Sequence, residues 1–310
     1  MAASRDDDAT ASRIGALYAI GAYGLWGVVP IYWKWIADLP ALELVGPRIG
    51  WTALLLVALL GASGRAREIL HVERRVLAPI VLAALLIAGN WFIFIYAVQT
   101  DQIIATSLGY YINPLVSVFL GLVVLGERLR PLQTAAVTLA CVGVAAFAVR
   151  AGSLPWISVV LAVSFGLYGL VHKMNPQPPL PGLAREMIVL LPLAAVIQGG
   201  LVFTGDSELV HASFGLHALV ALSGVVTAAP LFCFRAATAR LPLVAVGMFQ
   251  YLAPTITLLI AVALYGEAFT RDHAITFGCV WLALALFTFD AIRTASRAGA
   301  ARRIAPSEAS

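Results

Sequence analysis

The chain has 310 residues, of which 61% are hydrophobic and only 12% are charged, and its mean hydropathy is +0.92. A soluble domain carries about 25% charged residues and could not cover so much apolar side chain with polar surface. Composition therefore predicts an integral membrane protein and excludes a secreted disulfide scaffold and a disordered chain. It also excludes a nucleic-acid binder, because the positively charged residues behind the net charge of +4 are scattered between apolar runs.

Ten stretches are apolar and long enough to cross a bilayer, which takes roughly 20 residues. In chain order we expect spans at 14–33, 42–62, 76–97, 102–124, 133–149, 155–172, 182–204, 214–234, 242–264 and 273–292. The connections are too short for a separate soluble domain. Residues 1–13 and 293–310 are expected to be polar tails, and the first apolar stretch is expected to stay in the protein as a helix because no convincing cleavage site follows the leader.

The positions of Lys and Arg predict the orientation, because these residues concentrate in cytoplasmic connections. With the N-terminus inside, 15 of the 20 lie on the inner side, and Arg48 and Arg185 lie within spans or at their ends. The remaining three, on the outer side, are Lys34, Arg150 and Arg271. We therefore expect both termini in the cytoplasm and an even number of spans.

The two halves of the chain repeat each other. A shift of 140 residues aligns one set of four with another, without a gap: Tyr111, Pro114, Gly126 and Glu127 with Tyr251, Pro254, Gly266 and Glu267. Five spans in 14–149 thus repeat as five spans in 155–292. Because five is odd, the second copy begins on the opposite side of the membrane and is inverted relative to the first. The predicted fold is an all-α integral membrane protein of ten transmembrane helices in two inverted-topology five-helix repeats. Many secondary transporters are built this way, with the solute site near the midplane.

Few ionisable residues lie inside the expected spans, where charge is costly and functional roles are common, and two of them are candidates for a functional role. Arg48 lies about 10 Å deep in the second span at 1.5 Å per residue. It could hold a carboxylate or another acceptor on a solute, or it could bond helix-end carbonyls or snorkel outward. Glu186 occupies the equivalent place in the seventh span. It is a candidate for proton coupling or for meeting a cationic solute, and the alternative is a first-turn acid that complements the helix dipole.

A polar stripe runs along the fourth span through Thr106, Tyr110, Asn113 and Ser117. The matching face of the ninth span carries Gln250, with Tyr251 beside it, and the third span adds the pair Asn90-Trp91. Such groups line a cavity or hydrogen-bond between helices, and the stripe as a whole favours a cavity. The candidate lining residues also include three aromatic side chains, because aromatic faces stack on flat solutes and attract cations: Tyr23, Trp26 and Tyr168.

Pro114 and Pro254 occupy equivalent positions in the two halves, and a proline inside a helix favours a kink. We expect gating bends there. Glu127 and Glu267 each follow a glycine at the end of a span and are expected to be structural.

Several motifs are missing from the sequence. It contains no P-loop and no HExxH, its three cysteines form no CxxC pair, and its five histidines make no metal set. We therefore expect neither an enzyme nor a bound cofactor or metal. A channel would need a selectivity-filter sequence or rings of charge, which are not recognisable here.

Longer motifs resemble the RarD-type branch of the EamA family, in the drug/metabolite transporter superfamily. They are Asn90-Trp91, the run from Ser107 to Val116 and the run from Gly126 to Leu129, joined by Trp26-Gly27, Arg48 with Trp51, and Gln250-Tyr251 with Pro254. The resemblance implies two inverted halves around a central cavity, a cytoplasmic-membrane location and efflux of small metabolites or drugs. The family's usual His before the Arg of the second span is here Pro47, and its usual Glu-Thr pair is here Glu186-Met187.

These observations together predict a carrier that exports small organic solutes, amino-acid-like or amphenicol-like, by alternating access. Its partners would be the solute and the lipid bilayer, with protons as the candidate coupling ion and no nucleic acid. The alternatives are an uptake carrier, and a membrane sensor or scaffold without turnover. Substrate, direction of flux, coupling ion and oligomeric state are left open by the sequence.

Overall fold

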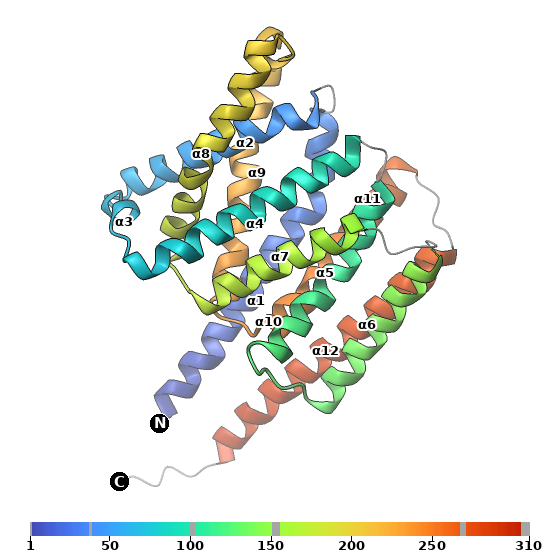
Figure 1. The fold of residues 1–310 in the computed structure, drawn as a ribbon. Coiled ribbons are helices and arrows are strands. Elements are labelled where there is room, and N and C mark those ends of the chain that lie inside the picture. The colour runs from blue at the N-terminus through green and yellow to red at the C-terminus, as the bar shows by residue number, and fades with distance from the viewer. Residues whose placement is uncertain (1, 37–38, 100–102, 151–155, 267–270, 305–310) are drawn as a thin grey trace.

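The computed structural model describes residues 2–36, 39–99, 103–150, 156–266 and 271–304 (Figure 1). Every regular element in these ranges is a helix, as expected from the composition. The elements are α1 (Ala2–Trp35), α2 (Ala41–Ala62), α3 (Arg67–Leu70), α4 (Arg74–Gln99), α5 (Ile103–Val123), α6 (Pro131–Arg150), α7 (Trp156–Met174), α8 (Pro179–Thr204), the 3-10 turn η1 (Leu209–His211), α9 (Phe214–Thr238), α10 (Leu243–Gln250), α11 (Leu252–Tyr265) and α12 (Arg271–Ile304).

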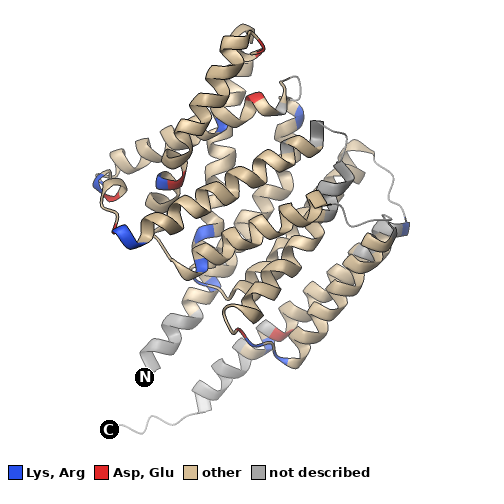
Figure 2. Ribbon diagram, in the orientation of Figure 1, with Lys and Arg blue, Asp and Glu red and all other residues tan. Residues whose placement is uncertain are grey.

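Eight segments within the described ranges are long and apolar enough to cross a membrane, and two shorter apolar helices accompany them. The eight are Thr10–Trp35, Leu42–Ala62, Arg74–Phe94, Trp156–Met174, Pro179–Thr204, Phe214–Thr238, Leu243–Tyr265 and Phe277–Thr294, and the shorter two are Gly109–Val123 and Pro131–Ala146. Figure 2 shows long stretches of α4, α5, α6 and α7 without a charged residue. A membrane-embedded helical protein is thereby confirmed.

The helices pack in an order that differs from their order in the chain. α1 lies against α9 and α11, α5 against α7 and α10, and α2 against α8 and α9, while α6 and α12 form a pair along one side (Figure 1). One buried cluster joins α1, α2, α4, α7, α8 and α9 around Tyr23, Leu56, Tyr168 and Phe234. A second cluster, which includes Tyr251, joins α5, α6, α10 and α12.

Two faces of the bundle are useful as reference points. The terminal face is the end where α1 starts and α12 ends, which Figure 1 shows on the same lower side of the molecule. The distal face is the end where α1 stops at Trp35 and α2 begins at Ala41. Because consecutive long helices alternate in direction, α7 and α9 end at the terminal face, whereas α5 and α9 begin at the distal face.

The expected span 242–264 is divided into α10 and α11, with the break at Tyr251. Pro254 follows three residues later, and its ring nitrogen has no hydrogen to donate to the carbonyl of residue 250. Pro114, at the equivalent place in the other half, lies inside the unbroken α5. The two prolines thus have different effects on helix continuity.

Glu127 and Glu43 fix helix starts from a distance. The carboxylate of Glu127 accepts hydrogen bonds from the backbone N–H groups of Leu243, at 2.6 Å, and Val244, at 2.8 Å. The connection between α5 and α6 therefore caps α10 and satisfies two of its free N–H groups. Glu43, only 1% exposed, accepts from the backbone of Leu209 at 2.9 Å and so holds η1. Glu267 lies outside the described residues.

Candidate functional site

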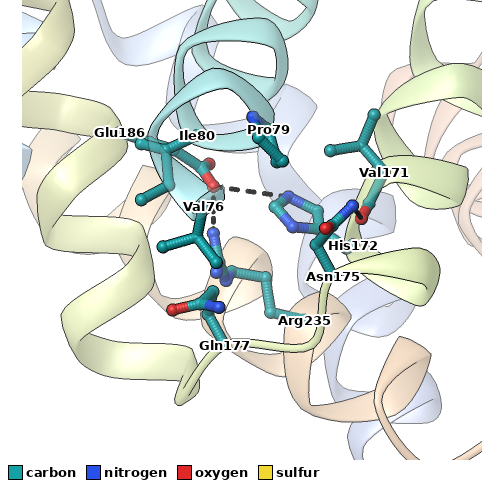
Figure 3. A pocket seen from close by; sticks show the side chains of 9 residues that line it. All are labelled: Val76, Pro79, Ile80, Val171, His172, Asn175, Gln177, Glu186 and Arg235. Carbon is teal, nitrogen blue, oxygen red and sulfur yellow. Dashed lines mark hydrogen bonds and ion pairs between the residues drawn. The ribbon is translucent and has the colours of Figure 1, made fainter. Parts of the chain in front are cut away.

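A buried ion pair lies near the terminal face, between α8 and α9. Arg235, 3% exposed, donates through Nη1 to Oε1 of Glu186, which is 1% exposed. The Tyr168 hydroxyl donates to the other carboxylate oxygen at 3.1 Å, and Nε2 of His172 lies 3.6 Å from Oε1 (Figure 3). Three polar side chains from two helices, α7 and α9, thus converge on the carboxylate of Glu186. A charge buried this deeply is tolerated because it is paired and hydrogen-bonded.

The local sequence explains how these groups meet. Tyr168 and His172 are four residues apart on α7 and therefore share one face. Glu186 lies two turns into α8, and Gly182 precedes it by one turn. A side chain at Gly182 would collide with the guanidinium of Arg235, whose Cζ lies 2.8 Å from the position of a Cβ there. The absence of a side chain at Gly182 leaves the room that Arg235 occupies.

A small pocket adjoins the ion pair on the side of α4 (Figure 3). Its walls are three apolar side chains from the start of α4, Val171 and His172 from α7, two amides from the α7–α8 connection, and the ion pair itself: Val76, Pro79, Ile80, Val171, His172, Asn175, Gln177, Glu186 and Arg235. The Nε atom of Arg235 and Nε2 of His172 are buried and make no hydrogen bond within the described part of the chain. Nε of Arg235 and Nε2 of His172 could therefore hydrogen-bond to a water molecule, and Nε2 of His172 could also bind a proton.

A second charged centre lies toward the distal face around Arg48. Its Nε donates to Oγ1 of Thr227 on α9 at 2.8 Å. Its guanidinium carbon lies 4.1 Å from the ring centroid of Trp91 and 5.3 Å from that of Trp33. No acidic side chain in the described ranges pairs with Arg48. The two centres thus differ, because the charge of Glu186 is compensated and that of Arg48 is not.

A close crossing of α2 and α9 sets the Arg48–Thr227 contact. A Cβ at Gly224 would lie 2.8 Å from the backbone carbon and oxygen of Trp51, so only glycine fits there. Thr227 follows Gly224 by about one turn and thereby reaches Arg48.

A cluster of aromatic rings adjoins the Glu186 centre. Tyr168 stacks on Phe234 with centroids 5.6 Å apart, and Trp26 meets Phe165 at 5.6 Å. Tyr23 lies 5.5 Å from Trp26 and is 2% exposed. The predicted aromatic residues are therefore brought together in one cluster, with Tyr168 as its link to Glu186.

The exposure of the polar stripe on α5 falls with depth. Tyr110 is 46% exposed, Asn113 is 8% and Ser117 is 1%. Ser117 accepts a hydrogen bond from Nε2 of Gln250 at 3.0 Å, which joins α5 to α10. The side chain of Thr106 lies outside the described residues. The stripe therefore passes from an exposed side chain in the half of α5 nearer the distal face to buried side chains further along the helix.

The remaining predicted residues lie elsewhere in the bundle. Asn90 donates through Nδ2 to the Leu161 carbonyl at 3.0 Å and to Oγ of Ser164 at 2.9 Å, so it joins α4 to α7. Tyr251 is fully buried in the second cluster, and its hydroxyl has no partner in the described ranges. Trp91 stands over Arg48, as described above.

Sequence reasoning missed Arg235 and Thr227. Arg235 was counted among the inner cations because the expected span ended at residue 234, whereas α9 continues to Thr238. The signal was available, since two further apolar residues, Ala236 and Ala237, follow Arg235. His172 is the last residue of the expected span 155–172, and it shares a helical face with Tyr168. No sequence signal distinguishes Thr227 from other hydroxyl residues in spans.

Comparison with known proteins gives concordant results. Residues 13–149 match the EamA-like transporter family. The chain is 42% identical over 293 residues to an uncharacterized transporter of Vibrio cholerae, covering 94% of this chain and 97% of that protein. It is 42% identical over 292 residues to Protein RarD of Salmonella typhimurium, covering 93% and 98%. Chloramphenicol-sensitive protein RarD of Pseudomonas aeruginosa is 30% identical over 286 residues, covering 90% and 95%.

The fold also resembles a solved structure. A crystal structure of a protein that is 20% identical superposes with a TM-score of 0.72 and covers 92% of this chain and 99% of that one. At this identity the similarity concerns the fold alone.

Proposed function

Because the chain belongs to the RarD-type branch of the EamA-like transporter family and is a multi-pass membrane transporter, we propose that it exports small organic metabolites or drugs by alternating access. The membrane is the cytoplasmic one, with both termini inside. The solutes are amino-acid-like or amphenicol-like molecules, and they bind in a central cavity between two inverted halves of five helices, 14–149 and 155–292.

The pattern of helix contacts supports the two inverted halves. In the proposed correspondence, α1 is equivalent to α7, α2 to α8, α4 to α9, α5 to α10 with α11, and α6 to α12. When equivalent helices are exchanged, the contact of α1 with α9 becomes that of α7 with α4. In the same way, the contact of α1 with α11 becomes that of α7 with α5. All four contacts exist, and the pairs that map onto themselves also pack together: α2 with α8, α5 with α10, and α6 with α12. Such equivalence favours two near-equivalent packings, one open to each side.

One observation carries the alternating-access proposal, namely the combination of a buried ion pair near the terminal face and a polar stripe that is exposed at Tyr110 and buried at Ser117. The Glu186–Arg235 pair and the aromatic cluster close the terminal side, whereas the stripe on α5 becomes more exposed from Ser117 to Tyr110. With the termini in the cytoplasm, we assign this arrangement to the outward-facing state. Inward opening requires that Glu186 and Arg235 separate.

We assign proton coupling to Glu186. Arg235, His172 and Tyr168 face its carboxylate, and no other acid belongs to this cluster in the described ranges. The other buried acids, Glu43 and Asp290, hold η1 and pair with Arg130. A proton on Glu186 removes the charge that holds Arg235, and so lowers the cost of opening the terminal face.

The solute site comprises Arg48 as the polar anchor, the aromatic residues Trp91, Tyr23, Trp26, Tyr168 and Tyr251, and the hydrogen-bonding residues Asn90, Tyr110, Asn113 and Gln250. The buried oxygens Oδ1 of Asn113 and Oε1 of Gln250 support this assignment, because neither has a hydrogen-bond donor in the described part of the chain. We assign the gating bends to Pro114 and Pro254, and the helix break at Tyr251 supports the second of these.

Counterflow in reconstituted liposomes tests the function. Liposomes loaded with an unlabelled compound receive the labelled one outside, across a panel of amino acids, amphenicols and aromatic cations. A carrier gives saturable, transient accumulation that depends on the preload. Liposomes without preload control for binding to protein and lipid. If folded protein exchanges no member of the panel, or gives flux without any effect of preload, the carrier proposal fails.

A further inference from the structure

We infer that the Arg48 site takes the carboxylate of an aromatic organic acid, and that the cavity therefore favours anionic solutes over neutral amphenicol-like or cationic ones. This inference rests on the proposed function, because it names the solute class of the same cavity.

The first argument is the uncompensated charge of Arg48. It lies seven residues into α2, and no acid pairs with it in the described part of the chain. Glu43, the acid that precedes it on the same helix, is committed to the Ser207 hydroxyl and to the N–H groups of Glu208 and Leu209. A guanidinium away from bulk water needs an anion or several acceptors. A solute that excludes water from the cavity without supplying an anion would leave this charge unpaired.

The second argument is the set of donors that Arg48 keeps free. Thr227 accepts from Nε only, at 2.8 Å. Within the described residues the two terminal nitrogens donate no hydrogen bond, and neither belongs to the fully buried atoms that lack a partner. The fork formed by these nitrogens matches the two oxygens of a carboxylate. Thr227 thus fixes the direction of the guanidinium and leaves its binding edge available.

The third argument is the aromatic surface beside the charge. Trp91 and Trp33 lie within 5.3 Å of the guanidinium carbon, and the Tyr110 ring is 46% exposed. These rings offer flat apolar area to the body of a bound acid. They cannot neutralise a cationic solute as a carboxylate would, and Glu43 is not free to do so.

Binding measurements on the purified full-length protein test the inference with matched probes. The probes are phenylacetate and indole-3-acetate, each paired with its neutral amide, together with chloramphenicol and phenethylammonium. We expect each carboxylate to bind about tenfold or more tightly than its amide, because a charge-assisted pair replaces a neutral hydrogen bond. Equal affinity for carboxylate and amide, or no carboxylate binding at millimolar concentration, would overturn the inference.

Variants assign the preference to Arg48. Arg48→Gln should reduce the carboxylate preference to about onefold, while Arg48→Lys keeps the charge, loses the fork and should retain an intermediate preference. Thr227→Val leaves Arg48 in place without its partner and should weaken carboxylate binding several-fold. Arg75→Gln is the control, since the Arg75 side chain is 80% exposed, and it should bind like the unaltered protein. Retention of the full preference by folded Arg48→Gln and Thr227→Val proteins contradicts the assignment.

The counterflow panel separates this inference from the proposed function. Exchange of chloramphenicol or phenethylammonium in preference to the two acids would support a carrier and refute the carboxylate site. Arg48-dependent binding of the acids without exchange of any compound would support the site and refute the carrier.

Discussion

At the scale of single residues, Arg48 and Glu186 occupy equivalent places on the second helix of each half but have opposite surroundings. Glu186 is held by Arg235, Tyr168 and His172, whereas Arg48 meets only a hydroxyl and aromatic rings. A compensated charge is suited to closing the protein, because it is stable without a ligand. An uncompensated charge is suited to binding, because a ligand completes it.

Glu186→Gln tests the coupling role. The neutral amide keeps the shape of the carboxylate but cannot exchange a proton, so we expect solute counterflow to continue and its response to an imposed pH gradient to disappear. Glu186→Asp should keep the response, and so should Glu68→Gln, an acid paired with Arg65 at an exposed site. An unchanged gradient response in Glu186→Gln liposomes would remove Glu186 from coupling.

Arg235→Gln tests the energetic weight of the ion pair. The change leaves a buried carboxylate without its cation, and we expect the unfolding free energy to fall by about 3–5 kcal/mol in an SDS or urea titration. The double variant Glu186→Gln with Arg235→Gln should recover part of this loss, because no charge is then left unpaired. Arg240→Gln, whose original side chain donates to the Ala236 carbonyl, should cost under about 1 kcal/mol. Equal losses in both single variants would argue against a buried pair.

At the scale of the elements, the crossing of α2 and α9 links packing to the proposed solute site. Gly224→Ala places a methyl group 2.8 Å from the backbone of Trp51, and α9 must move away. We expect a loss of about 1–3 kcal/mol in stability, typical of overpacking, together with weaker carboxylate binding as Thr227 leaves Arg48.

Gly200→Ala is the matched control, since its Cβ meets nothing within 4 Å on α8. A helical glycine in open space gains from alanine, so this variant should be as stable as the original or slightly more so. Gly224→Ala with unaltered stability and binding would mean that the crossing is not tight.

Much of the helical frame follows from the sequence, because about 20 apolar residues in a row leave a chain few alternatives in a bilayer. The break at Tyr251 was harder to foresee, since Pro114 occurs in the same local context and α5 stays continuous. Only contacts with neighbouring helices distinguish the two. The partners of Glu186 and Arg48 depend on the packing of α8 and α2 against α9, and hydropathy contains no information on such pairs. The contact of Arg48 with Trp91 likewise could not be predicted from the positions of the two residues in the sequence.

At the scale of the whole molecule, the helices of one half pack mainly on those of the other. α1 contacts α9 and α11, and α5 contacts α7 and α10, so relative movement of the halves alters contacts at both faces together. Opening one face while closing the other is the movement that such an arrangement permits most readily. The Glu186–Arg235 pair then acts as one of the contacts that distinguish the two states.

Cysteine labelling at two depths of α5 tests this movement, in protein whose native cysteines, Cys141, Cys233 and Cys279, are replaced. Tyr110→Cys should react with a membrane-impermeant maleimide from the outside of the cell, because residue 110 is 46% exposed and lies in the half of α5 nearer the distal face. Ser117→Cys, at a position 1% exposed, should be protected from both sides. Removing the pair with Glu186→Gln and Arg235→Gln should make residue 117 reactive in inside-out vesicles only. Labelling of residue 110 from the cytoplasmic side would reverse the proposed orientation, and continued protection of residue 117 in the double variant would show that the pair is not what keeps the terminal face closed.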